Sequence, residues 1–449
     1  MKVINFWGNQ RLAQFLFLSI ILTPLLPPVA LLCIAAAVLW HRKEYRFLKS
    51  LDWPEKAFIG FMLISAVSWL VEPSWFYGIP VGLIPIAMFG LYWMLAVWIR
   101  HLSWSWQEVQ KTYLAFWLSG LYIAVIVFIQ QMDWHVINDS FVGNILQFYN
   151  DFRFQSERSV RSIGTSGNSN LTAALLICFS LMSIYAASVL KKKWHKLMAF
   201  LIFGVYVTAI WCTGSRGAWA GLLIGLIVQL WMTGHRKRTV TITLAIFLLI
   251  SCFPELIPRK ETLQATIEVR LEVWTTAFKI FREHWLLGVL PLHFGQLFVK
   301  EAGFYVYHAH NIFLGVASEF GVLGLGLFLW MLLLTIQRAR RWRKVANQKE
   351  EKRLAGMLLS LTIALLGHGM YDYPIIAPQI GLMFMLSVII IHTQYVRRCV
   401  NKPDWSKSSE PEREFPAFSE RKVISWILLF IPYEVMYWIY RVFVHRKIE

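Results

Sequence analysis

The chain has 449 residues, of which 57% are hydrophobic and 16% aromatic, and its formal net charge is +18. This composition and the positive mean hydropathy argue against an ordinary soluble domain. The excess of lysine and arginine would suit a nucleic-acid-binding protein, but it lies mostly in short connections between apolar stretches, where membrane topology and anionic lipid account for it. We therefore expect an integral membrane protein that binds no nucleic acid.

Apolar stretches long enough to cross a bilayer recur along the chain. The hydrocarbon core needs about 20 mostly apolar residues. The segment 12–40 is broken by Pro27 and Pro28, so it forms either one kinked span or a two-helix hairpin, and we favour the hairpin. The sequence thus predicts an all-α integral membrane protein with about 12 transmembrane helices. The other predicted spans are 56–72, 77–99, 112–131, 171–190, 197–213, 217–233, 239–255, 311–335, 354–372 and 376–395.

Lysine and arginine are concentrated in alternate short connections, and such connections tend to stay in the cytoplasm. The basic connections are 41–46, 100–111, 191–196, 235–238 and 338–353. By this alternation two long loops, about 132–170 and 256–310, are extracytoplasmic. The larger one joins the span that ends near 255 to the span that starts near 311, and we expect functional residues in both loops.

The membrane domain is expected to occupy residues 1–400. The segment 401–422 is polar and rich in Pro, Ser and Glu, which indicates a disordered cytoplasmic linker. The segment 423–449 is apolar but contains Pro432 and Glu434 and has basic residues near both ends, so a membrane-interfacial amphipathic helix is favoured over another span. The five cysteines show no metal-ligand spacing and predict neither a disulfide nor a zinc site.

Two predicted extracytoplasmic segments combine glycine with arginine. Gly-Ser-Arg-Gly at 214–217 joins two spans with almost no loop, which places Arg216 at the membrane surface. Snorkelling toward lipid phosphate would explain this arginine, but the glycines on either side favour a tight turn over a helix flank. The segment 161–170 could present backbone donors to an anion at a helix N-terminus, or it is a loop capped by Ser169 or Asn170.

The large loop carries Arg270, which by itself would be expected to pair with Glu268 or Glu272 on a solvated helix face. Farther along, His308 and His310 are two residues apart, a spacing that puts side chains on opposite sides of an extended segment. Only one is therefore expected to address a given pocket, and a general base is favoured over a metal ligand.

Three further ionisable residues follow the histidines. Glu319 lies nine residues beyond His310 and is expected to be a buried structural or charge-balancing group. His368 and Asp372 are four apart, so they would share a helical face and form a hydrogen-bonded pair.

Together these segments resemble the O-antigen ligase and Wzy-type polymerase superfamily of bacterial membrane glycosyltransferases, over roughly 161–374. His310-Asn311, followed after nine residues by Gly-Val-Leu-Gly at 321–324, looks like the family's histidine signature. The sequence at 214–217 is similar to its arginine turn. Arg270 resembles the second arginine of its large extracytoplasmic loop, and Arg161 with 164–170 resembles a further element.

The resemblance implies polysaccharide biosynthesis in the cell envelope. A glycan carried on undecaprenyl pyrophosphate would be transferred to a hydroxyl or amine of a lipid, glycan or protein acceptor, at the outer face of the bacterial cytoplasmic (inner) membrane. Arg216, Arg270 and Arg161 would bind the pyrophosphate. His310 would be the catalytic base of an inverting displacement, with His308 as the alternative base or an orienting neighbour. No cofactor or metal is implied.

Supporting roles are expected for Asn170, Glu319 and Asp372. The rings of four aromatic residues are expected to offer faces for sugars: Trp274, Phe304, Tyr305 and Tyr307.

The motifs do not separate a ligase from a polymerase. Two other functions remain open: a transporter or lipid-linked glycan flippase, and a noncatalytic assembly partner. The ionisable residues cluster at one membrane face rather than inside the spans, which favours the enzyme over a transporter.

Overall fold

The computed structural model describes residues 27–40, 51–102, 104–132, 161–234 and 260–400, with a few positions between 19 and 23 and between 237 and 252. The predicted linker 401–422 and interfacial helix 423–449 lie outside the described residues. So do most of the predicted span 239–255, most of the loop 132–170 and the first part of the segment 12–40.

The described chain is almost entirely helical, as predicted. Its only strands form a two-residue hairpin, β1 (Trp75–Phe76) antiparallel to β2 (Ile79–Pro80). Short 3₁₀ turns occupy Gly164–Ser166, Lys260–Thr262 and Pro374–Ile376, and a π turn occupies Val396–Val400. The α-helices are α2 (Pro27–Trp40), α3 (Glu55–Val71), α4 (Leu83–Leu102), α5 (Trp106–Ser119), α6 (Leu121–Gln131), α8 (Ser169–Val189), α9 (Lys193–Thr213), α10 (Arg216–Met232), α12 (Leu263–Glu283), α13 (His293–Ala302), α14 (Ile312–Val345), α15 (Lys349–Gly369) and α16 (Pro378–Tyr395).

Six helical segments of the described part are long and apolar enough to cross a membrane, and α10 is a shorter apolar helix. The chain is therefore an all-α membrane protein, while the expected number of spans stays a prediction. One predicted span needs correction, and another is divided into two helices. The span placed at 77–99 began too early, because residues 75–80 form the hairpin before α4. The span at 112–131 is a continuous apolar segment, but its helix is divided into α5 and α6 at Gly120, against which Phe179 packs.

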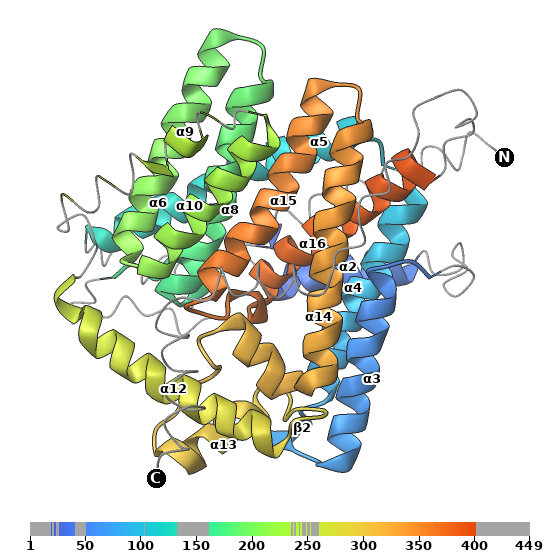
Figure 1. The fold of residues 1–449 in the computed structure, drawn as a ribbon, viewed down its shortest axis with the longest axis vertical. Helices are drawn as coiled ribbons and strands as arrows, with labels where there is room; N and C mark the ends of the chain where they lie inside the picture. The colour runs from blue at the N-terminus through green and yellow to red at the C-terminus, as the bar shows by residue number, and fades with distance from the viewer. Residues whose placement is uncertain are drawn as a thin grey trace. The chain divides into compact units, whose positions relative to one another are not determined.

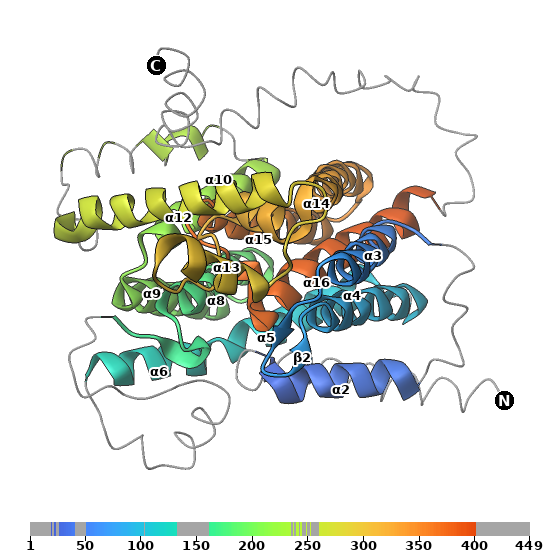
Figure 2. The same ribbon diagram turned by 90° about the horizontal axis from the view of Figure 1, so that it is seen from below.

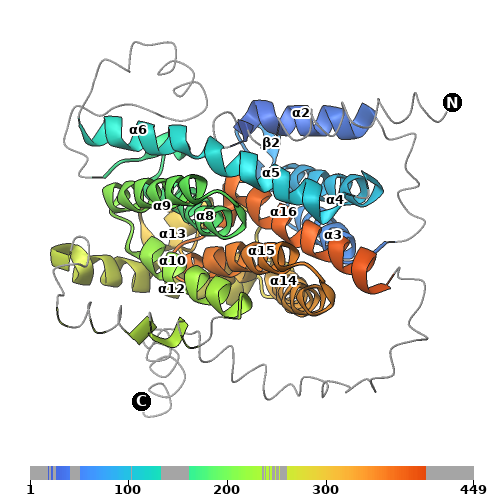
Figure 3. The ribbon, with the colours of Figure 1, turned by 90° about the horizontal axis from the view of Figure 1, so that it is seen from above.

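Two helices form the centre of the bundle because they are apolar on every side. In α8 and in the segment Pro378–Val400, which contains α16, 83% of the span is buried inside the protein. Such all-round hydrophobicity marks a helix surrounded by other helices rather than by lipid. Figure 3 shows these two helices beside α10 and α15, with α5 and α6 along one edge.

Helices α10 and α15 approach each other closely because glycines line their contact. A Cβ atom at Gly221 would lie 2.8 Å from the carbonyl oxygen of Ala364, and one at Gly225 would lie 2.7 Å from the Cβ atom of Ala364. Small residues allow this separation between helix backbones in a membrane. The contact holds the first turn of α10, with Arg216, beside the last turn of α15, just before Asp372.

Helices α12 and α13 lie at one end of the bundle, opposite the connections that join α8 to α9 and α14 to α15 (Figure 1). Seen from that end, α12 runs across the ends of α10, α15 and α14 (Figure 2). The Gln296 amide donates to the carbonyl of Trp75 in the hairpin at 3.0 Å, and Ser68 donates to the carbonyl of Gly288 at 2.9 Å. The described part of the large loop is therefore an ordered helical layer fixed to the bundle.

Candidate active site

The two histidines sit on a short segment that leads into α14. Asn311 is the N-cap of that helix, and its side-chain oxygen accepts from the amides of Phe313 at 3.0 Å and Leu314 at 3.1 Å. Its amide group donates to the carbonyl of Met370 at 3.0 Å. One side chain therefore starts the helix and ties the histidine segment to the turn that follows α15.

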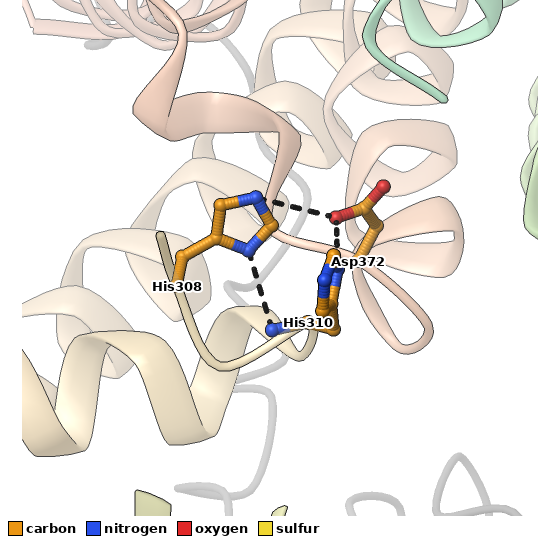
Figure 4. Close-up of side chains that lie close together, drawn as sticks. All are labelled: His308, His310 and Asp372. Carbon is orange, nitrogen blue, oxygen red and sulfur yellow. Dashed lines mark hydrogen bonds and ion pairs between the residues drawn. The ribbon is translucent and has the colours of Figure 1, made fainter. Parts of the chain in front are cut away.

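His308 and His310 face the same carboxylate, that of Asp372 (Figure 4). His310 Nδ1 lies 3.0 Å from Asp372 Oδ1, and His308 Nε2 lies 3.7 Å from the same oxygen. The prediction that the histidines point to opposite sides is wrong. His310 has a φ of 47°, so the segment turns instead of extending, and the His310 amide donates to His308 Nδ1 at 3.3 Å.

The two histidines differ in solvent exposure, and therefore in the role that each can have. The His310 side chain is 32% exposed, compared with 11% for His308 and 4% for Asp372. Burial lowers the pKa of His308 to about 4, despite the opposing charge of Asp372, so this imidazole is neutral at pH 7. A carboxylate on Nδ1 leaves Nε2 of His310 as the nitrogen that can accept a proton. The geometry favours His310 as the base.

Asp372 is a buried carboxylate held in its charged form. Burial tends to raise its pKa, but the hydrogen bond with His310 and the charges of His308, His310 and His368 outweigh burial and lower it below the usual range. A charged carboxylate fixes the tautomer and orientation of the imidazole and stabilises the imidazolium that proton transfer produces. His310 and Asp372 therefore form a dyad suited to general-base catalysis.

Because His308 is buried and neutral, we expect the folded protein to lose stability in acid. In the unfolded chain this histidine binds its proton below about pH 6.5, but in the folded protein only below about pH 4. Its contribution to stability is therefore complete above pH 6.5 and is lost as pH falls from 6.5 toward 4. The thermal unfolding midpoint in detergent should drop over this interval, and His308→Asn should flatten the drop. An exposed-histidine control, His195→Asn, should leave it unchanged, and equal slopes in all three proteins would contradict the assignment.

Two arginines on different helices are linked through α12, and one of them, Arg270, lies beside the dyad. Arg216 is the first residue of α10, and its guanidinium donates to Thr266 Oγ1 on α12 at 2.7 Å. Arg270 follows one helical turn after Thr266 and lies over the ring of Tyr371, with Cζ 5.8 Å from the ring centroid. Burial lowers the pKa of Arg270, while Asp372 and Tyr371 oppose the shift. An arginine remains charged through such a shift, so a positive group lies next to the dyad.

The expected settings of both arginines need correction. Arg216 does not sit within a turn, because the turn is made by Gly214, with a φ of 61°, and Ser215 before the helix begins. The interpretation of Arg270 as a partner of Glu268 is also not seen. Glu268 accepts instead from Gln264 at 3.1 Å.

Arg161 contacts the turn that precedes Arg216. Its Nε donates to the carbonyl of Thr213 at 2.8 Å and its Nη2 donates to Asn170 Oδ1 at 2.7 Å. Arg161 and Asn170 thus brace the turn that precedes Arg216. The predicted caps Ser169 and Asn170 are wrong by one or two positions, because Asn168 caps α8 through the amides of Asn170 and Leu171.

Two predicted residues, His368 and Trp274, are placed differently from expectation. His368 forms no hydrogen bond with Asp372 in the described structure, because α15 ends at Gly369 and Asp372 lies beyond it. Glu319 is buried, as expected, at 1% exposure. Trp274 is also buried and donates its indole N–H to the carbonyl of His310 at 3.3 Å, so it supports the site rather than offering a face. The rings of Phe304, Tyr305 and Tyr307 are exposed.

Sequence reasoning did not identify the contacts that assemble the site. The partnership between His310 and Asp372 spans 62 residues, and the contact between Arg216 and Thr266 spans 50. A local signal existed for Asn311, since asparagine just before an apolar periodic segment is a helix-start signal. For Thr266 the sequence offered only a weaker signal, its position one helical turn before Arg270.

The site also satisfies the spacing of a metal centre. One ligand atom from each of His308, His310 and Asp372 lies within 4.8 Å of the others. The sequence alone favoured a general base over a metal ligand, but the structure brings the carboxylate of Asp372 beside both histidines. Two imidazoles and one carboxylate are a known donor set for catalytic zinc, whereas a base with an orienting carboxylate needs only the hydrogen-bonded pair of His310 and Asp372.

Comparison with known proteins places this site in a family context. Residues 199–329 match the family model described as O-antigen ligase. No curated protein matches the chain. The matched range contains Arg216, Arg270 and His310 and ends before Asp372. The protein is thus a helical membrane protein whose residues 199–329 match the O-antigen ligase family model, and its resemblance to the O-antigen ligase and Wzy-type superfamily is confirmed.

Proposed function

We propose that the protein transfers a glycan from undecaprenyl pyrophosphate to a hydroxyl or amine acceptor, as an O-antigen ligase-like enzyme or a polysaccharide polymerase. The observation that carries the proposal is the meeting of a carboxylate-bound histidine with two arginines at one end of the bundle. The histidine precedes α14, the carboxylate follows α15, and the arginines come from α10 and α12. A base beside anion-binding groups suits the displacement of a pyrophosphate by a hydroxyl.

The proposed reaction is a single displacement. His310 Nε2 accepts the proton of the acceptor hydroxyl as its oxygen attacks the anomeric carbon, and the bond from that carbon to the pyrophosphate oxygen breaks with inversion. Arg216 and Arg270 stabilise the charge on the departing undecaprenyl pyrophosphate, since the guanidinium fork matches phosphate oxygens. Asp372 holds the imidazolium until the proton leaves to solvent.

We further propose that the site faces away from the cytoplasm. The lysine-rich start of α9, with Lys192 and Lys193, lies at the end of the bundle opposite α12 and α13 (Figure 1). Positive connections of this kind favour the cytoplasmic side. The polyprenyl chain of the donor would then remain in the outer leaflet, with its pyrophosphate at the level of the arginines.

A metal-assisted mechanism is the second candidate, and the spacing of His308, His310 and Asp372 favours it. A bound divalent ion would make the site dependent on metal. We expect glycan transfer by the purified protein to be unchanged after dialysis against EDTA and in metal-free buffer. A loss of transfer that Zn²⁺ or another divalent cation restores would replace the general base by a metal centre.

The proposed function is tested in proteoliposomes that contain the purified protein and an undecaprenyl-pyrophosphate oligosaccharide with a labelled glycan. Transfer to an added lipid acceptor, with an inverted anomeric linkage, would support the ligase form. A ladder of repeat units on the donor lipid without an added acceptor would support the polymerase form. Movement of intact donor across the bilayer without formation of a glycosidic bond would contradict the enzyme and support a flippase.

A further inference from the structure

Glu319 is a buried carboxyl group inside a membrane-spanning helix. It is 1% exposed, and neither carboxylate oxygen has standard hydrogen-bond geometry to a polar atom of the described residues. Ionisable residues within membrane helices are costly and most often have a functional role with a specific partner. The proposed reaction gives this carboxyl group no role, although it lies in the first part of the helix that begins beside His310.

Tyr373 packs on the same face of α14 as Glu319. The Tyr373 ring packs into the space that the missing side chain of Gly315 leaves on α14, where an added Cβ would lie 2.6 Å from ring carbons. Gly315 precedes Glu319 by four residues, so both lie on one face of the helix. Burial and the Glu319 carboxyl raise the pKa of Tyr373 well above its usual value, and the protonated phenol approaches this carboxyl as a donor.

Tyr373 also contacts the candidate active site. Its ring meets the ring of His308 edge to face, with centroids 6.0 Å apart. Its backbone N–H donates to Asp372 Oδ1 at 2.8 Å, the same oxygen that binds His310. A shift of Tyr373 would therefore move the carboxylate and the buried imidazole together.

Glu319 is itself held rigidly by its backbone. Helix α14 is broken at Gly321, which has a φ of 65° and a ψ of −169°. The connection between α12 and α13 fits into this break, and Leu290 N–H donates to the carbonyl of Glu319 at 2.9 Å. A Cβ at Gly288 would overlap the carbonyl carbon of Glu319, so the two segments touch backbone to backbone. The carboxyl thus has a fixed position from which to hold Tyr373.

We propose that Glu319 and Tyr373 form a positioning pair that sets Asp372 and His308 in the geometry that His310 requires. The proposal rests on the proposed function, because the pair acts only through the dyad. Neither residue touches the substrate. The pair connects the dyad to the break in α14 and to the large loop, and therefore to the layer that carries Arg270.

The test compares kinetic constants for glycan transfer. Glu319→Leu and Tyr373→Phe should each lower kcat by roughly tenfold, with KM for the donor changed less than about twofold, because a small displacement of a catalytic group slows the chemical step. Glu319→Gln should restore most of kcat, since the amide oxygen can accept from the phenol. The double variant that combines Glu319→Leu with Tyr373→Phe should be no slower than either single variant, because both changes remove one contact.

Ser318→Ala is the matched control, since Ser318 is equally buried beside Glu319 and its hydroxyl donates only to carbonyls of its own helix. It should leave kcat and KM within about twofold. The positioning pair would be overturned by an unchanged kcat in Glu319→Leu, or by a double variant whose loss of kcat equals the product of the two single losses. His310→Ala tests separately whether the dyad catalyses transfer. If Glu319→Leu unfolds in detergent, Tyr373→Phe and Glu319→Gln carry the test, because both keep nearly the same volume. A tenfold loss in Glu319→Gln would also overturn it.

Discussion

Replacing His310 with alanine should lower kcat for glycan transfer by roughly 10³-fold, within the range found for loss of a general base. The acceptor hydroxyl would lose the nitrogen that takes its proton, while the arginines would still bind the donor, so KM for the donor should change little. Asp372→Asn should cost at least about 10²-fold, because the amide cannot stabilise the imidazolium or enforce the Nδ1–H tautomer. Initial rates at equal protein concentration in proteoliposomes measure both effects.

The double variant that combines His310→Ala with Asp372→Asn should be about as slow as His310→Ala alone, because the carboxylate acts through the imidazole. His284→Asn is a suitable control. His284 lies at the C-terminal end of α12, the helix of Arg270, and pairs with Glu72 at 3.0 Å. Transfer within about twofold of the unmodified protein is expected from it. If His310→Ala kept more than about a tenth of the activity, the assignment of the base would be wrong.

The second large effect is expected at the arginines. Arg216→Ala and Arg270→Ala should each lower kcat/KM for the donor by roughly 10²-fold to 10³-fold, because each removes a charged donor from the departing pyrophosphate. Lysine at either position should recover only part of this loss, since it keeps the charge but lacks the planar fork that binds two phosphate oxygens. The measurement is a donor titration at saturating acceptor.

Arg282→Ala provides the matched control for Arg270, because Arg282 lies on the same helix and is exposed at its C-terminal end. It should behave like the unmodified protein. Full recovery by lysine would show that a positive charge alone is sufficient. Bidentate binding of phosphate oxygens by the guanidinium would then not be needed. Loss of activity in Arg282→Ala equal to that in Arg270→Ala would point instead to a general effect of charge on the α12 surface.

The sequence predicted the helices well where the pattern was local. Long apolar stretches mark spans because every buried backbone group must be paired within its own helix, and α8, α9 and α16 start and end close to the predicted positions. The errors arose where apolar residues serve another purpose. Trp75 to Pro80 form an aromatic hairpin before α4, and the division at Gly120 depends on packing against Phe179 from a different helix.

The residues of the candidate site could be picked out from the sequence, but their arrangement in space could not. Glycines beside Arg216, and Asn311 after His310, are signals that can be read in order along the chain. The turn at His310 is not such a signal, since the contact that holds this histidine at a positive φ comes from Asp372, 62 residues farther along the chain. The separation of Asp372 from His368 likewise follows from the end of α15, which a four-residue spacing cannot reveal.

The most direct test of the central claim is the stoichiometry of one reaction in proteoliposomes: undecaprenyl pyrophosphate released against glycan transferred, for the unmodified protein and for His310→Ala. We expect equal amounts of both products from the unmodified protein and almost none from the variant, because cleavage of the donor and formation of the new linkage are one step. Donor that crosses the bilayer intact, or equal product from both proteins, would contradict a glycosyltransferase that uses His310 as its base.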